Sequence, residues 1–212
     1  MTYTPVTGLE IRMNFYTNAN CVLEDVIENY FYQYFSLVNP LIQGRKESIA
    51  GRPTDGIIRF YNEDRKLLGW VLQETKRDIG LQSVFVARSF LQSVMYLGNI
   101  FYDTNILGVD NFVGIFLDSA RYFCFVPKSV IVEVMEDFEP LWNKYYRVAP
   151  SQAYKEYELE MWAKITWHKI EKYCYELNNS FRLDEILQTI YEKYLNYGIN
   201  DGTDVAGKSN KN

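Results

Sequence analysis

Two carboxylates and a lysine stand at positions where a β-hairpin would bring them together. Asp55 directly precedes one strand pattern, and Glu74 and Lys76 end the next, two residues apart. Residues i and i+2 of a strand project to one face, so Glu74 and Lys76 project together while Thr75 turns away. A hairpin places the start of its first strand beside the end of its second, which predicts that Asp55 joins them. Two carboxylates from different strands can hold Mg²⁺ beside a lysine that orients water or stabilises phosphate charge.

A second polar pair, Gln92 and Tyr96, follows on a predicted helix. The two residues are four apart and share a helix face, which can look back at the carboxylates because the helix follows the Lys76 strand. Each of these residues alone is typical of a turn or a solvated surface. Their joint order along the chain favours a site.

The rare residue types exclude other kinds of chemistry. The single histidine, His168, would have to serve any histidine-based nucleophile system or metal motif, and its helical surroundings favour an ordinary surface position. No CxxC spacing is present, which argues against structural zinc and favours buried free thiols at Cys21, Cys124 and Cys174. The sequence also lacks a GxxxxGKS phosphate loop and a GxGxxG pattern.

The chain of 212 residues is long enough for one domain, or for one domain with a helical extension. It has no apolar run of membrane-spanning length and no signal-peptide pattern at its start, so we expect a cytoplasmic protein with no membrane partner. The net charge of −5 argues against a broad nucleic-acid-binding surface. Basic side chains nevertheless surround the predicted hairpin; they are Arg45, Lys46, Arg52, Arg65, Lys66, Lys76, Arg77 and Arg88.

The hydrophobic pattern predicts an α/β domain with a mixed sheet flanked by helices. Helical spacing over 20–34, ended by Pro40, precedes a polar stretch at 43–53 that indicates a loop. The remaining expected elements are strands 56–61 and 67–74 around a turn at 62–65, a helix over 81–102, and strands 112–117 and 122–126 around a turn at 118–121.

The rest of the chain is expected to be helical. One helix over 129–138 stops before Pro140, and others span 151–177 and 184–197. The residues from 198 onward are small and polar, which is typical of a linker or a flexible end. We therefore predict a core over 1–139, a helical C-terminal extension over 140–197 and a tail over 198–212.

The series Pro53-Thr54-Asp55, Glu74-Thr75-Lys76 and Gln92-xxx-Tyr96 resembles the PD-(D/E)xK nuclease superfamily, in particular its RecB-like members. The resemblance covers residues 20 to about 126 and implies a restriction-endonuclease-like fold. It also implies a DNA nuclease that hydrolyses phosphodiester bonds with Mg²⁺, or Mn²⁺ in its place. Asp55 and Glu74 would then be metal ligands, with the Thr75 main-chain carbonyl as a further ligand. Lys76 would be the catalytic lysine that assists the attacking water.

The same resemblance gives supporting roles. Gln92 and Tyr96 would orient the site or contact DNA, and a glutamate of the first helix, either Glu24 or Glu28, would join it. The sequence departs from the family pattern where Thr54 separates the proline from the aspartate. The basic residues expected to contact DNA are Arg45, Lys46, Arg52 and Arg77.

Residues 72–77 also resemble the nuclease segment of some restriction–modification polypeptides, in which a methyltransferase follows the nuclease. The polar tail would then be a linker, and a methyltransferase domain or subunit a partner. Cleavage of both DNA strands by one site per chain would favour a homodimer. The alternative is a catalytically inactive nuclease-fold module that binds nucleic acid or a protein. A weaker third hypothesis is an adaptor that docks a partner through its aromatic C-terminal half.

Overall fold

A mixed six-stranded sheet forms the centre of the protein in the computed structural model, which describes residues 28, 32, 36, 39–76, 83–103, 109–118 and 122–176. Strands β5 and β6 run parallel, and the other neighbouring strands run antiparallel. The sheet confirms the predicted α/β class. In spatial order its strands are β1 (Ile42–Arg45), β4 (Gly56–Tyr61), β5 (Leu67–Thr75), β6 (Phe112–Asp118), β7 (Tyr122–Pro127) and β8 (Cys174–Glu176).

The β4–β5 hairpin forms as predicted. Its turn is closed by the Lys66 N–H, which donates to the Asn62 side chain at 2.8 Å, and Arg65 adopts a positive φ of 62°. An asparagine that bonds the backbone a few residues on is a common way to close such a turn. Ile57 faces Leu72 across the pair, which fixes the register of every residue towards the open end of the hairpin.

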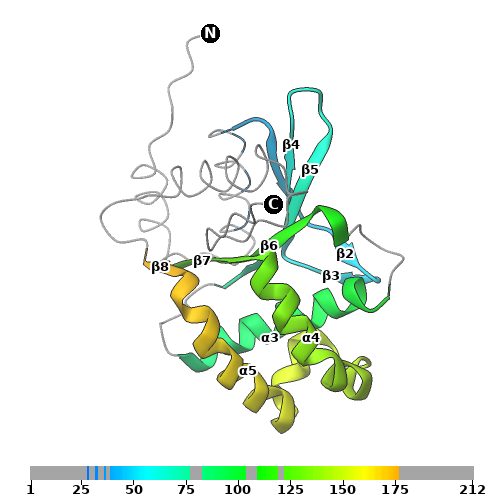
Figure 1. The fold of residues 1–212 in the computed structure, drawn as a ribbon, viewed down its shortest axis with the longest axis vertical. Helices are drawn as coiled ribbons and strands as arrows, with labels where there is room; N and C mark the ends of the chain where they lie inside the picture. The colour runs from blue at the N-terminus through cyan, green and yellow to red at the C-terminus, as the bar shows by residue number, and fades with distance from the viewer. Residues whose placement is uncertain are drawn as a thin grey trace, which may run out of the picture.

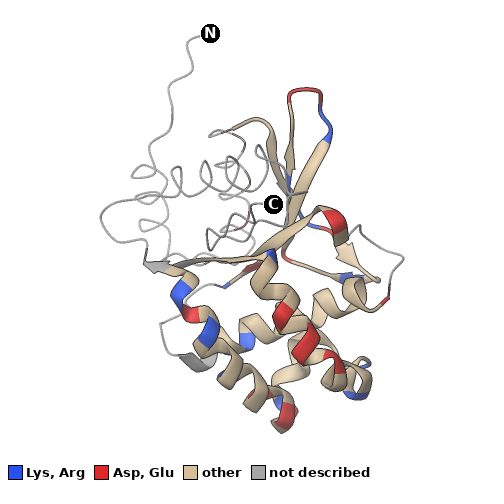
Figure 2. Cartoon of the chain, in the orientation of Figure 1, with Lys and Arg blue, Asp and Glu red and all other residues tan. Residues whose placement is uncertain are grey.

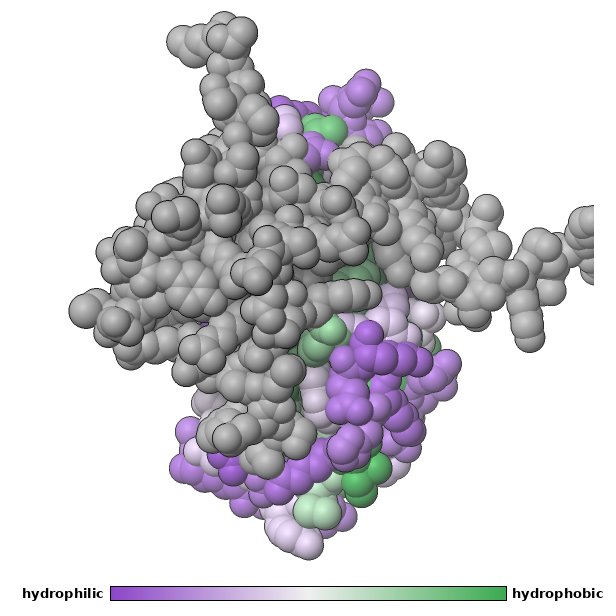
Figure 3. All heavy atoms as spheres, turned by 90° about the vertical axis from the view of Figure 1, so that its left-hand side faces the viewer, coloured by the Kyte–Doolittle hydropathy of each residue, from purple (hydrophilic) through white to green (hydrophobic). Residues whose placement is uncertain are grey.

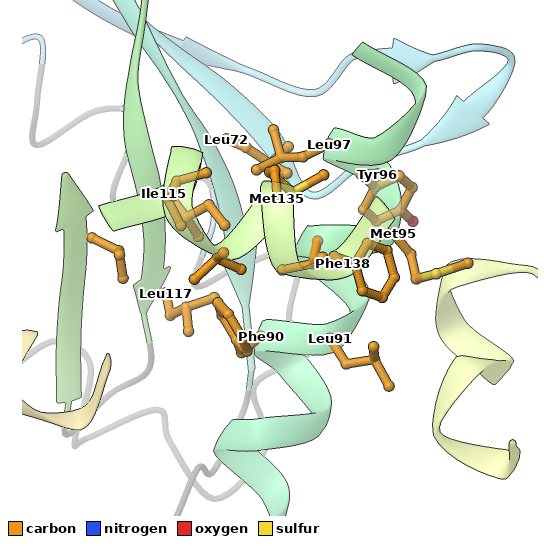
Figure 4. Packing of buried hydrophobic residues seen from close by; sticks show 14 of the residues in the cluster. Leu72, Phe90, Leu91, Met95, Tyr96, Leu97, Ile115, Leu117, Met135 and Phe138 are labelled. Carbon is orange, nitrogen blue, oxygen red and sulfur yellow. The ribbon is translucent and has the colours of Figure 1, made fainter. Parts of the chain in front are cut away.

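Three helices gather on one side of the sheet (Figure 1): α3 (Ser83–Phe101), α4 (Lys128–Tyr145) and α5 (Tyr157–Ile170). The predicted helix over 81–102 is therefore confirmed as α3. Close packing joins Leu72 of β5 to Leu97 of α3 (Figure 4), and both side chains are fully buried. Alternate residues along the strands face this core, as the two-residue strand period requires.

The opposite face of the sheet is contacted by Tyr32. Residues 28, 32 and 36 are helical, in agreement with the helical spacing read in this region, whereas most of the predicted helix over 20–34 lies outside the described residues. A Cβ atom at Gly44 of β1 or at Gly56 of β4 would collide with the Tyr32 ring. The two glycines thus leave the room that lets this tyrosine lie against the sheet.

The loop predicted over 43–53 is wrong, because the segment contains three short strands. β1 pairs with β4 at the sheet edge, and β2 (Ser48–Ile49) pairs with β3 (Arg52–Pro53) around Ala50 and Gly51, both at positive φ. Polar residues are tolerated at an edge because only one side of the strand must bond and pack. The composition of the segment therefore hid its pairing.

The helix end predicted before Pro140 is also wrong, since α4 continues through this residue to Tyr145. A proline in a helix interior removes one backbone hydrogen bond and costs about 3 kcal/mol. Phe138 and Trp142 lie one turn apart on either side of Pro140, and both are buried. Burying two aromatic side chains offsets a cost of that size.

The long helix predicted over 151–177 divides into several elements. They are η2 (Pro150–Lys155), α5, η3 (Glu171–Tyr173) and strand β8, with extended backbone at Glu156 between the first two. The boundary predicted between 139 and 140 falls inside α4, and residues of α4 and α5 share one core with α3. The predicted helix over 184–197, the tail over 198–212 and most of the turn at 118–121 lie outside the described residues.

Acidic side chains gather on α4 (Figure 2), where Glu133, Glu136, Asp137 and Glu139 are exposed. The side on which α5 lies is mainly hydrophilic over its described part, with small apolar patches (Figure 3). No helix in the part of the chain that the structure describes is long and apolar enough to cross a membrane.

Gly98 provides a test of the packing between α3 and α4. A Cβ atom at this buried glycine would collide with the Trp142 indole ring. Alanine normally stabilises a helix interior by about 1 kcal/mol relative to glycine. We expect Gly98→Ala instead to lower the free energy of unfolding by about 1–3 kcal/mol, because a rigid ring must shift. Urea denaturation measures the change, and Glu133→Ala at an exposed position of α4 is the control. A Gly98→Ala protein more stable than the wild type would contradict this packing.

Candidate active site

The strand register brings Asp55, Glu74 and Lys76 together, as the sequence predicts. Gly56 at the start of β4 faces Gln73 near the end of β5, so the next position outward places Asp55 beside Glu74. The Thr75 N–H donates to Asp55 Oδ2 at 2.7 Å, which fixes that carboxylate against the strand. The site therefore lies where the hairpin opens, at one end of two buried strands.

The Lys76 ammonium is the centre of this group. Its Nζ atom lies 2.5 Å from Glu74 Oε1, 2.8 Å from the Thr75 carbonyl oxygen and 3.5 Å from Asp55 Oδ2. Glu74 is fully buried, whereas the side chains of Lys76 and Asp55 remain about a quarter exposed. A buried carboxylate is tolerated because a cation reaches it from the solvent side.

The side chains at the end of β5 alternate between the two faces of the sheet. Glu74 and Lys76 project towards the side that carries α3, in line with Leu72 of the core. Gln73 projects oppositely, and its side-chain amide donates to the Thr75 hydroxyl at 3.0 Å. The prediction that Thr75 turns away is thus confirmed for its side chain, while its main-chain carbonyl stays with Lys76.

The short segment that carries Asp55 is held by hydrogen bonds along its backbone. The Tyr96 hydroxyl donates to the Pro53 carbonyl at 2.6 Å, and the Tyr32 hydroxyl donates to the Asp55 carbonyl. Between them, the N–H and hydroxyl of Thr54 both donate to the Glu47 carbonyl at 2.8 Å. Thr54, which separates the proline from the aspartate, is buried and serves to anchor this segment.

Gln92 and Tyr96 of α3 lie at the site, as predicted. Burial, followed by the negative charges of Glu74 and Asp55, raises the pKa of the Tyr96 hydroxyl, and a hydrogen bond with Gln92 opposes the rise. Tyr96 therefore remains a neutral hydrogen-bond donor at physiological pH. Its position links the helix to the backbone before Asp55 and into the field of both carboxylates.

Of the two candidate glutamates, Glu28 is described and Glu24 lies outside the described residues. Glu28 is almost fully buried, and its Oε2 atom lies 2.8 Å from Lys46 Nζ. Tyr32 follows one helical turn later and contacts Asp55, which places Glu28 on the helix face that meets this end of the sheet.

The basic residues proposed to contact DNA have defined neighbours. Arg45 is largely exposed and pairs with Glu47, and the half-exposed Lys46 pairs with Glu28. Arg52 donates to the main-chain carbonyls of Tyr146 and Val148 after α4, so part of its capacity binds the protein itself. Arg77 lies outside the described residues.

The oxygen atoms at the site fit a hard divalent cation. Asp55 Oδ2, Glu74 Oε1 and the Thr75 carbonyl converge on one point, which the Lys76 ammonium occupies. Mg²⁺ prefers such oxygen ligands and completes its shell with water and substrate oxygens. Over the described residues, no group of three or more His, Cys, Asp or Glu side chains could hold a metal ion.

Sequence reasoning missed Glu47 and Tyr32 as supports of the site. Glu47 accepts two hydrogen bonds from Arg59 and one from Arg45, while its carbonyl holds Thr54. The sequence shows that Glu47 lies two residues after Arg45 and shortly before the Asp55 segment. It does not show that the pairing of β1 with β4 brings the Arg59 guanidinium to the Glu47 carboxylate.

A scan against protein-family models matches none, and searches of curated proteins and of solved structures also find no match for this chain. The assignment of function therefore depends on the chemistry of the site.

A double-mutant cycle tests the pair formed by Glu74 and Lys76. We expect Lys76→Met to lower the free energy of unfolding by about 3 kcal/mol, because a buried carboxylate loses its cation. Adding Glu74→Gln should recover most of that loss, with a coupling energy of about 2 kcal/mol. Chemical denaturation of the four proteins measures the cycle, and additive losses would show that the two groups do not interact.

The contacts of Glu47 should make the free energy of unfolding sensitive to acid. Burial raises the pKa of its carboxyl, but hydrogen bonds from Arg59 and Arg45 outweigh this, and the pKa falls below the usual 4.5. The stabilisation is therefore complete above the unfolded pKa and is lost as pH falls through the lower folded value. Between about pH 5 and pH 3 the wild type should lose more unfolding free energy than Glu47→Gln. Exposed Glu63→Gln is the control, and equal slopes for the wild type and Glu47→Gln would contradict the prediction.

Proposed function

We propose that this protein is a metal-dependent nuclease that hydrolyses phosphodiester bonds in DNA, with a PD-(D/E)xK-type site. One observation carries the proposal. Three oxygens, from Asp55, Glu74 and the Thr75 carbonyl, converge on the Lys76 ammonium at the open end of a hairpin. The Gln92 and Tyr96 pair on the adjacent helix adds support, because it reaches the same group.

The roles of the residues follow from their contacts. Asp55 and Glu74, with the Thr75 carbonyl, would hold Mg²⁺ or Mn²⁺, which supplies Lewis-acid stabilisation of the phosphate and a more acidic bound water. The Lys76 ammonium would move away from the point where the three oxygens converge. It would then donate hydrogen bonds to the attacking water or to a non-bridging phosphate oxygen. Tyr96 would position Asp55 through the Pro53 carbonyl.

The charge distribution gives a path for an anionic strand. Arg45 and Lys46 lie at the end of β1, opposite the start of β4 and so beside Asp55, and both side chains are at least half exposed. Acidic residues instead gather on α4. A local basic region on an acidic protein can still bind DNA, with an affinity that falls steeply with salt.

Metal binding and cleavage separate the roles of the three residues. Glu74→Gln keeps the shape of the side chain but removes its charge and replaces one acceptor oxygen with an NH2 donor, so we expect loss of Mn²⁺ binding and at least a hundredfold loss of plasmid cleavage. Lys76→Met should bind Mn²⁺ more tightly than the wild type, because a competing cation is gone, and yet fail to cleave. Calorimetric titration and a gel assay measure the two effects, and circular dichroism monitors the fold.

Glu63→Gln is the matched control, since it makes the same change in the exposed turn of the hairpin. Undiminished cleavage by both site variants would overturn the catalytic assignment. A wild type that binds Mn²⁺ at this site and retains DNA without cutting it would favour the inactive binding module instead.

A further inference from the structure

Cys124 and Cys174 face each other across the last two strands of the sheet. They are direct partners in the antiparallel pairing of β7 with β8. Both are free thiols, and a hydrogen bond joins their side chains. Cys124 is buried, whereas Cys174 is partly exposed. The sequence separates these cysteines widely, so only the sheet brings them together.

The spacing of such a pair suits a covalent bond. Opposed residues in antiparallel strands have Cα atoms about 4.5 or 5.5 Å apart, depending on the type of pair. Disulfides span Cα separations of about 4.4–6.8 Å, so either type falls inside this range. Because the thiols already share a hydrogen bond, the sulfur atoms can meet by side-chain rotation, with little backbone movement.

From this geometry we infer that Cys124 and Cys174 form a reversible redox site, which a hydroperoxide converts into an intrachain disulfide. The exposed member reacts first: the Cys174 sulfur attacks the peroxide, the O–O bond breaks, and water or an alcohol leaves as Cys174 becomes a sulfenic acid. The Cys124 sulfur then attacks the Cys174 sulfur, the S–O bond breaks, and water leaves with the Cys124 proton. Two thiols are oxidised and one hydroperoxide is reduced.

The burial of Cys124 explains why it does not react with the peroxide first. Burial, reinforced by its contact with Cys174, raises the pKa of the Cys124 thiol well above the usual value, so this thiol is protected from direct oxidation in solution. Its attack on a sulfenic acid at Cys174 is favoured by the contact between the two side chains, which offsets the small thiolate fraction of a buried thiol. Cys174 is thus the sensing thiol and Cys124 the resolving thiol.

The disulfide would lie in register with the candidate active site. Glu74 of β5 is the partner of Leu117 in β6, Leu117 is the partner of Cys124, and Cys124 is the partner of Cys174. Neighbouring strands are about 4.8 Å apart, so Cys124 lies about 10 Å from Glu74 along one row of the sheet. The bond would fasten the short edge strand β8 to that row.

Peptide mapping of the full chain tests the inference without any substitution. After treatment with hydrogen peroxide and alkylation of remaining thiols, we expect one linked pair of peptides containing Cys124 and Cys174, and dithiothreitol should release it. Cys21→Ser is the control and should give the same linkage. A stable sulfinic acid at Cys174 beside an unreacted Cys124 thiol, or linkage of either residue to Cys21, would overturn the inference.

Thermal unfolding supplies a second readout. Closing the long loop between the two cysteines restricts the unfolded chain, so the oxidised wild type should unfold several degrees higher than the reduced protein. Peroxide should leave the midpoint of Cys174→Ser unchanged. A shift of equal size in Cys174→Ser would show that the effect does not come from this pair. Neither readout requires nuclease activity, so the inference stands or falls separately from the proposed function.

Discussion

The buried carboxylate of Glu74 imposes the constraint on which the rest of the site depends. A charge at the end of a core strand is stable only when a cation and hydrogen-bond donors meet it, and Lys76 meets it from the same strand face at 2.5 Å. Asp55 completes the group from the neighbouring strand. The two carboxylates carry two negative charges, of which the Lys76 ammonium offsets one, and a divalent ion in the place of that ammonium would offset both. The contacts that hold the fold therefore also define a candidate metal site.

The position of Asp55 depends on elements far from it in the sequence. Tyr96 of α3, Tyr32 of the first helical region and Glu47 after β1 each bind the backbone at or beside residues 53–55. A carboxylate on a short connecting segment would otherwise sample several positions, and a metal site requires one. Thr54, which stands between the proline and the aspartate, is held in this segment because its hydroxyl and N–H both donate to the Glu47 carbonyl.

Local pattern predicted most of the elements correctly where hydrophobic periodicity was strong, as in β4, β5, α3, β6 and β7. It failed where long-range packing outweighs local preference. The edge strands within 43–53 gain their hydrogen bonds from β4 and from each other, and α4 passes Pro140 because Phe138 and Trp142 are buried on either side. The last strand, β8, exists because β7 offers it an edge, and neither its length of three residues nor its polarity predicts it.

The sequence by itself determined which residues form the candidate site, because the two-residue period of a strand and the antiparallel return of a hairpin leave little freedom for Asp55, Glu74 and Lys76. It also determined that Gln92 and Tyr96 share a helix face. The tertiary structure alone decided that Tyr96 reaches the Pro53 carbonyl, that Glu28 meets Lys46 and that Cys124 meets Cys174. Local spacing carries the first kind of information, since it acts within one element; the second kind requires the strand order and the packing of helices on the sheet.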